Sequence, residues 1–360
     1  MKREDQRAAM TKPNTTDVAI VGGGIVGLAL ALDLAERGAQ VTIWERDRCG
    51  MGATHAAAGM LAPEAEGLTG DLLTLGRRAR DGYGRWIAQL RKRSELPCGY
   101  WCCGIVAPQF AEEPPAPLSR PELLQKQAGL GEGIVGGYWY PEDGQVNNRL
   151  LLQSLRAAAM QAGVKIQEGT KVYGWQRRGD RLTHAETNGG PQAADIFVVA
   201  SGAQSRGLVP VPVAPVKGQM LAVFDPERRL QRVLFSSRAY IVPRQDGTIV
   251  VGATVERVGF QPGNTAAGLH QLLSGAIAVW PPLADLPVVE TWWGFRPYAP
   301  DEKPLLGRVP NLENLWLNVG HYRNGILLAP LCAQLLGRAI ATGEIDPLLA
   351  AFAPPPLVSF

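Results

Sequence analysis

The sequence has few of the residues from which disulfide frameworks and metal centres are built. Five cysteines and four histidines occur among 360 residues. An odd cysteine count that includes the adjacent pair Cys102 and Cys103 is not typical of a secreted disulfide scaffold. The cysteine cluster at residues 98–103 has no histidine nearby and matches no zinc-site spacing. We therefore expect reduced, partly buried thiols and no metal site.

A strong charge of either sign and the apolar core of a signal peptide are also missing. The formal net charge is only +3, which gives no reason to expect nucleic acid or an anionic membrane as a partner. Residues 1–17 are polar and charged. Residues 18–35 are apolar enough to suggest a membrane span, but they contain a glycine cluster and Asp33. These features predict a cytoplasmic protein without a membrane anchor, with residues 1–14 disordered.

A G-x-G-x-x-G motif stands between a predicted strand and a predicted helix. Its glycines are Gly22, Gly24 and Gly27, and Glu45 follows at the tip of a second predicted strand. In such units the first glycine allows a tight turn, the second lets a pyrophosphate approach the backbone, and the third lets helix and strand pack closely. The helix N-terminus attracts phosphate, while Glu45 would accept ribose hydroxyls and repel a 2′-phosphate. The unit predicts a dinucleotide site but does not separate FAD from NAD.

The order of the predicted elements indicates two domains. Segments typical of a parallel nucleotide-binding sheet occur at the start, middle and end of the chain, and antiparallel segments fill the gaps. The predicted fold class is α/β plus antiparallel β, with a Rossmann-like nucleotide domain and a discontinuous antiparallel-sheet substrate domain. A ligand site is expected where the domains meet. The expected boundaries are 15–96, 147–213 and 305–350 for the nucleotide domain, and 97–146 and 214–304 for the substrate domain.

Seven segments of the chain resemble the glycine oxidase branch of the D-amino acid oxidase family of FAD enzymes. The resemblance extends over residues 17–341, and its most specific segment is Gly-His-Tyr-Arg-Asn-Gly-Ile-Leu-Leu-Ala-Pro at 320–330. It implies an FAD-binding Rossmann-like domain and an antiparallel substrate domain. The segments are 18–28 with Glu45, 54–62, 215–218, 240–244, 251–254, 293–297 and 320–330.

The resemblance also implies where FAD binds. The binding should be noncovalent, because no cysteine stands beside Arg296, where the related sarcosine oxidases carry the thiol that tethers flavin. His55 departs from the serine common in the family. The start of the last predicted helix would point its positive end at the flavin C2 carbonyl. The implied cofactor residues are Gly22, Gly24, Ile25, Val26, Gly27, Glu45, Arg46, Thr54, His55, Ala57, Ala58, Gly59, Met60, Val172, Ala200, Ser201, Gly202, His321, Arg323, Asn324, Gly325 and Ile326.

Three residues are implied for the substrate, namely Arg296, Tyr240 and Arg323. A guanidinium binds an amino acid carboxylate through two parallel N–H bonds. From the residues alone, Arg296 could be a surface arginine and Tyr240 a core tyrosine. His321 could be a general base, although a packing role in a turn suits it better.

The implied reaction is oxidative deamination of glycine or another small amino acid or amine to the imino acid. Oxygen would be reduced to hydrogen peroxide, and the product would feed thiamine thiazole synthesis. Arg238 and Val255 differ from similar enzymes, so the substrate range stays open. Two alternatives remain, a dehydrogenase that passes electrons to a quinone and an RNA-modifying oxidase domain. The near-neutral charge argues against RNA, and homo-oligomer formation is left open.

Overall fold

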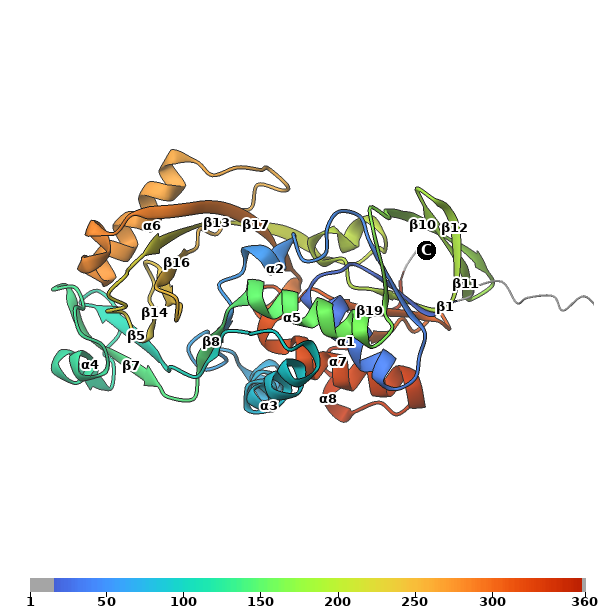
Figure 1. Ribbon diagram of the computed structural model, residues 1–360, viewed down its shortest axis with the longest axis horizontal. Helices are drawn as coiled ribbons and strands as arrows, with labels where there is room; N and C mark the ends of the chain where they lie inside the picture. The colour runs from blue at the N-terminus through green and yellow to red at the C-terminus, as the bar shows by residue number, and fades with distance from the viewer. Residues whose placement is uncertain (1–15, 358–360) are drawn as a thin grey trace, which may run out of the picture.

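The protein contains two eight-stranded sheets, which follow one another along the long axis of the molecule (Figure 1). The structure is a computed structural model that describes residues 16–357. The predicted disorder of residues 1–14 therefore lies outside the described residues. A small third sheet joins β3 (Met60–Leu61), β8 (Gly144–Val146) and β4 (Tyr100–Trp101).

The first sheet is mostly parallel and contains the glycine turn. β1 pairs in parallel with β2 and β12, β2 with β9, and β12 with β19. Buried residues alternate along β1, so that Val18 and Ile20 face one side and Ala19 and Val21 the other. The strands are β1 (Thr16–Val21), β2 (Val41–Glu45), β9 (Lys165–Glu168), β10 (Val172–Arg178), β11 (Arg181–Thr187), β12 (Gly190–Val199), β18 (Leu305–Arg308) and β19 (Leu315–Val319).

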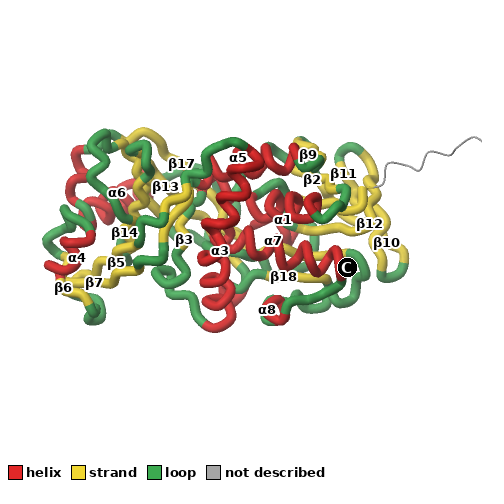
Figure 2. Tube along the Cα trace, turned by 60° about the horizontal axis from the view of Figure 1, so that its bottom comes forward, coloured by secondary structure: helices red, strands yellow, loops and turns green. Residues whose placement is uncertain are grey.

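Four helices cover the Val18 face of this sheet and gather in the middle of the molecule (Figure 1 and Figure 2). The two central ones, α1 and α7, pack against each other, and α3 packs on α5 and α7. By length and composition α7 could cross a membrane, but 67% of it is buried inside the protein. The helices are α1 (Ile25–Glu36), α3 (Gly70–Ser94), α5 (Asn148–Gln161) and α7 (Gly325–Thr342), with the short α2 (Ala53–Ala56) and α8 (Pro347–Ala350).

The second sheet is antiparallel except where β14 runs parallel to β5. α6 (Ala266–Val279) and α4 (Arg120–Lys126) cover one of its faces, and the other face packs with Ala56 of α2. Its strands in spatial order are β17 (Val288–Tyr298), β13 (Ala214–Phe224), β16 (Thr248–Gly252), β15 (Tyr240–Pro243), β14 (Val233–Phe235), β5 (Ile105–Phe110), β7 (Ile134–Tyr140) and β6 (Leu118–Ser119).

This architecture confirms the predicted fold class, a helix-covered parallel sheet combined with an antiparallel sheet. The domain boundaries drawn from the sequence stay a prediction. Three 3₁₀ turns complete the described elements, namely η1 (Gly202–Gly207), η2 (Pro281–Asp285) and η3 (Pro300–Glu302).

Candidate functional site

Two adjoining cavities lie where the sheets approach each other. The larger cavity has a volume of about 780 Å³ and the smaller cavity about 490 Å³. Both volumes fall within the range of cofactor and small-molecule sites, roughly 300–1,000 Å³. The cavities meet, because they share the lining residues Ala53, Ala57, Gly294, Phe295, Tyr322, Arg323 and Ile326.

The glycine turn forms one wall of the larger cavity. Gly22 has a φ of 113°, and a Cβ there would lie 2.5 Å from the carbonyl oxygen of Ala200. A Cβ at Gly27 would collide with the carbonyl oxygen of Gly22, so this glycine allows α1 to pack against the turn. At Gly24 the nearest atom to a Cβ would be Thr54 Oγ1, at 3.4 Å. The backbone at Gly24 is therefore open for a ligand to approach.

Glu45 holds its carboxylate in a fixed position at the end of β2, against the larger cavity. One oxygen accepts the Gly23 N–H at 2.8 Å, and the other accepts the Asp47 N–H at 3.0 Å. A carboxylate has about four acceptor positions. Two of them stay available to hydroxyl donors such as those of a ribose.

Two buried polar side chains of the larger cavity have unpaired atoms. Asn318 on β19 donates its amide to the carbonyl oxygen of Val26 at 3.2 Å. Its Oδ1, and Nε2 of His321, have no hydrogen-bond partner within the described part of the chain. Burial lowers the pKa of His321 to about 4, so the imidazole is neutral near pH 7 and is a weak base. Buried polar atoms normally have partners, so these two atoms indicate a polar ligand or water.

The segment 54–58, here called the alanine segment, separates the cavities and is fixed through its backbone. Asn148 donates one amide group to the segment's first two carbonyl oxygens, at 2.7 and 3.0 Å. The indole N–H of Trp292 donates to the third carbonyl oxygen at 3.2 Å. These hydrogen bonds hold the backbone of the segment in place. The small side chain of Ala57 lines both cavities.

Arg244, directly after β15, fixes the end of the same segment. Its guanidinium donates to the carbonyl oxygens of Ala58 at 2.7 Å and Val146 at 3.0 Å, and to side-chain oxygens of Asn148 and Gln145. Only 7% of the residue is exposed, and it forms no ion pair among residues 16–357. Burial lowers its pKa to about 10, which leaves it charged near pH 7. The sequence placed Arg244 in a recognisable motif but gave it no role.

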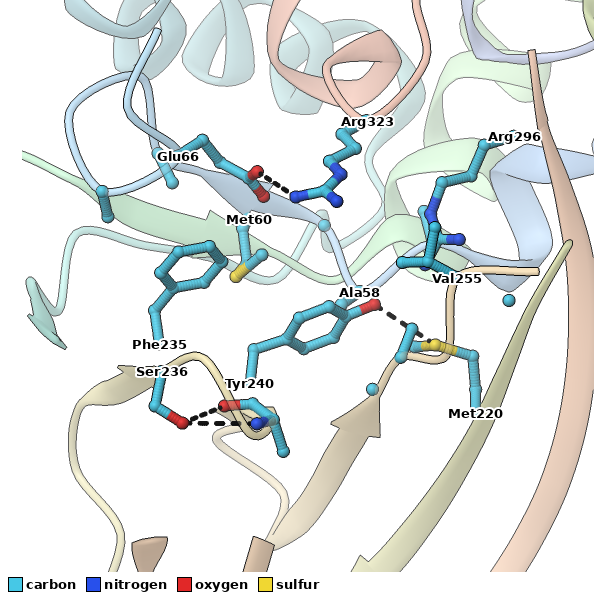
Figure 3. Close-up of a pocket in the computed structure, with 18 of the residues that line it drawn as sticks. Ala58, Met60, Glu66, Met220, Phe235, Ser236, Tyr240, Val255, Arg296 and Arg323 are labelled. Atoms are coloured by element: carbon cyan, nitrogen blue, oxygen red, sulfur yellow. Dashed lines mark hydrogen bonds and ion pairs between the residues drawn. The ribbon is translucent and has the colours of Figure 1, made fainter. Parts of the chain in front are cut away.

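Of two arginines in the smaller cavity, one has a carboxylate partner and the other has none within the described part of the chain. Arg296 donates to the carbonyl oxygens of Thr254 at 3.1 Å and Lys217 at 3.4 Å, and no carboxylate of the described residues is within ion-pair distance. Arg323 lies 3.4 Å from a carboxylate oxygen of Glu66. Figure 3 shows this pair on one side of the cavity and Arg296 on the other. The smaller cavity therefore offers one uncompensated cation to a ligand.

Tyr240 lies between these charges on the cavity floor (Figure 3). Its hydroxyl donates to the sulfur of Met220 at 3.2 Å. Burial raises the pKa of Tyr240 above its usual value, so the phenol stays protonated and can donate. The structure thus brings Arg296, Tyr240 and Arg323 into one cavity.

The sequence-implied cofactor residues, except Gly27, each line at least one of the two cavities. Their roles in binding FAD stay predictions. Ala57, Arg323 and Ile326 line both cavities. Ala58, Gly59, Met60 and Asn324 line the smaller one. The larger cavity is also lined by Gly22, Gly24, Ile25, Val26, Glu45, Arg46, Thr54, His55, Val172, Ala200, Ser201, Gly202, His321 and Gly325.

The chain matches the family model described as DAO, FAD dependent oxidoreductase, over residues 17–339. The protein belongs to this family. FAD is the cofactor of the family, and the larger cavity fits it through the open glycine turn, the fixed Glu45 carboxylate and the two unpaired polar atoms. The five cysteines are unpaired, and four of them are buried.

Curated relatives are similar over most of this chain. A bifunctional protein ThiO/ThiG from Nostoc sp. is 46% identical and aligns with 94% of this chain but 54% of its own length. The chain thus spans about half the length of that relative. A glycine oxidase from Pseudomonas aeruginosa is 34% identical over 94% of this chain and 98% of its own.

Solved structures extend the similarity to the fold. Glycine oxidase from Geobacillus kaustophilus superimposes with a TM-score of 0.90 at 32% identity, over 97% of this chain and 100% of its own. Iminodiacetate oxidase from Chelativorans sp. BNC1 gives a TM-score of 0.84 at 27% identity, over 95% of this chain and 100% of its own. These two solved structures carry the names glycine oxidase and iminodiacetate oxidase.

Proposed function

We propose that this protein oxidises glycine or another small amino acid or amine to the imino acid, with oxygen reduced to hydrogen peroxide. The observation that carries the proposal is the uncompensated guanidinium of Arg296 in a cavity that adjoins the FAD cavity. Relatives named glycine oxidase support it, since one of them aligns over 98% of its length. The ThiO/ThiG relatives support a place in thiamine thiazole synthesis.

Arg296 binds the substrate carboxylate in this proposal. Its two hydrogen bonds go to backbone carbonyls, so other N–H groups of its five remain free for a two-point contact. Tyr240 is protonated, and its single O–H, which is directed at the Met220 sulfur, would turn to donate to the same carboxylate. Together they would orient the substrate against the alanine segment, and orientation is a large part of catalysis by such sites.

FAD, when bound, supplies the two-electron acceptor. We expect noncovalent binding, since no cysteine within residues 16–357 lines either cavity to form a thioether with the flavin. Glu45 and the glycine turn would hold its ADP half. The N-terminal end of α7, at Gly325 and Ile326, lies against the larger cavity and contributes positive potential there.

A flavin-bleaching screen tests the proposal. Purified protein is mixed anaerobically with glycine, sarcosine, D-amino acids and L-amino acids, and flavin absorbance is followed. Glycine or sarcosine should bleach the flavin, and admission of air should restore the colour with formation of peroxide. Bleaching that air does not reverse would indicate a quinone as acceptor. No bleaching by any small amine would refute the proposed function.

A further inference from the structure

Some charged residues of the smaller cavity have partners of opposite charge among the described residues, and others do not. Five charged residues line it, namely Glu66, Glu113, Arg238, Arg296 and Arg323. Two of them serve other contacts: Arg238 pairs with the exposed Glu112 at 2.7 Å, and the Glu113 carboxylate accepts the Phe110 N–H at 2.7 Å. The pair of Glu66 with Arg323 leaves Arg296 as the only cation among these residues without a carboxylate partner.

The backbone of Glu66 is fixed beside Arg323. Its N–H donates to the carbonyl oxygen of Ala62 at 2.9 Å, and the next N–H, of Gly67, donates to that of Glu64 at 3.0 Å. Only 9% of the Glu66 side chain is exposed, compared with 37% for Arg323. The carboxylate therefore faces the cavity from a rigid turn. Burial raises the pKa of Glu66, while the Arg323 guanidinium opposes that shift and favours the charged form.

A substrate with one carboxylate and a substrate with two would experience this cavity differently. The first carboxylate would bind Arg296. A second carboxylate at the other side would meet Arg323 already neutralised, with the negative charge of Glu66 close to it. The fold itself does not impose this limit, since a relative with the same architecture is named iminodiacetate oxidase.

We propose that Glu66 restricts the enzyme to monocarboxylic amines by neutralising Arg323, the second cation available to a substrate. This inference rests on the proposed function. Glu66 is here a specificity-determining residue, and its removal should free Arg323 to bind a second carboxylate.

The test compares sarcosine with iminodiacetate, in which a carboxylate replaces one hydrogen of the N-methyl group. Glu66→Gln keeps the shape of the side chain and removes the charge. We expect the ratio of kcat/KM for iminodiacetate to that for sarcosine to rise at least tenfold, which corresponds to about 1.4 kcal/mol. The double variant Glu66→Gln with Arg323→Met should lose the gain, because the freed cation is then absent.

Glu64→Gln is the matched control. Glu64 is two positions away and loses the same charge, but it pairs with Arg77 at 2.6 Å and lines neither cavity. The ratio should stay at the parent value in this variant. An equal rise in Glu64→Gln and Glu66→Gln would refute the inference, because it would show a general charge effect.

Binding titrations separate failure of the inference from failure of the proposed function. Glycolate and diglycolate, carrying one and two carboxylates, can be titrated against the flavin spectrum without any turnover. Glu66→Gln should bind diglycolate at least tenfold more tightly than the parent and glycolate about equally. If Glu66→Gln oxidises sarcosine with the parent's kcat/KM ratio and binds diglycolate with the parent's affinity, the role of Glu66 is refuted. That result would leave the proposed function intact. If the parent oxidises neither glycine nor any other small amine, the proposed function fails, and the titration still decides the inference.

Discussion

Replacement of Arg296 by alanine tests the carboxylate clamp directly. The side chain crosses Gly218 of β13, where a Cβ would lie 2.6 Å from both terminal nitrogens. This close crossing and the hydrogen bonds to Thr254 and Lys217 hold the guanidinium in one place. Its removal would leave a substrate carboxylate unpaired in a partly desolvated cavity, at a cost of about 2–5 kcal/mol. That is a loss of affinity of roughly tens-fold to thousands-fold.

The assay is a glycolate titration of the flavin spectrum, together with steady-state kinetics on glycine. FAD content and melting temperature should change little, because Arg296 lines the smaller cavity and not the larger one. Arg296→Lys should recover only part of the affinity, since an ammonium cannot make the two-point contact. Arg238→Ala is a suitable control, because its guanidinium already pairs with Glu112.

Unchanged glycolate affinity in Arg296→Ala, with full FAD content, would refute the clamp. Arg323 would then be the next candidate, but it could act only after Glu66 had been displaced or protonated. A primary amine without a carboxylate should be affected much less than glycine by the same substitution. An equal loss for both substrates would mean that Arg296 supports the site as a whole.

Four further predictions follow from the cavities and their supporting network. Acid precipitation should release all flavin as FAD into the supernatant, and flavin retained in the pellet would contradict noncovalent binding. Arg244→Met should lower the melting temperature and weaken FAD binding, because it leaves several buried oxygen acceptors unpaired at about 1–3 kcal/mol each. An unchanged FAD affinity would show that the alanine segment needs no support from Arg244. Asn318→Ala should weaken FAD binding by about 0.5–1.5 kcal/mol with little change in the melting temperature of the apoprotein, as measured by flavin fluorescence titration. The flavin reduction rate at subsaturating glycine should rise from pH 6 to pH 9, because the neutral amine of glycine is the reactive form. Neither His321, whose pKa is lowered to about 4, nor Tyr240, whose pKa is raised, titrates in that window. A flat profile, with chemistry shown to be rate-limiting, would count against this mechanism.

The sequence predicts best what depends on local spacing. The glycine turn and Glu45 lie within one strand-helix-strand unit, so their geometry follows from a short stretch of chain. Tyr240 could be suggested only through a resemblance, because from the residues alone it could be a core tyrosine. Arg296 could be suggested through the same resemblance together with its aromatic neighbours. The structure places both in one cavity with Arg323.

The residues that sequence reasoning missed depend on long-range contacts. Glu66 is 257 positions from Arg323, and Arg244 is 186 positions from Ala58. Neither contact leaves a periodic or local signal. The short strand β14 is a similar case, because its place in the sheet depends on pairing with β15 on one side and with the distant β5 on the other.

The connectivity of the first sheet has a consequence for synthesis on the ribosome. β1 obtains its second neighbour only when β12 has emerged, and β12 obtains β19 only at residues 315–319. The helix α1 is apolar on nearly every side, and its neighbour α7 ends at Thr342. A nascent chain therefore carries an apolar helix whose α7-facing side stays uncovered through most of translation, a species prone to aggregation and chaperone capture. Ribosome-stalled chains that end before residue 315 should be cleaved within α1 by proteases that spare the same helix in the finished protein.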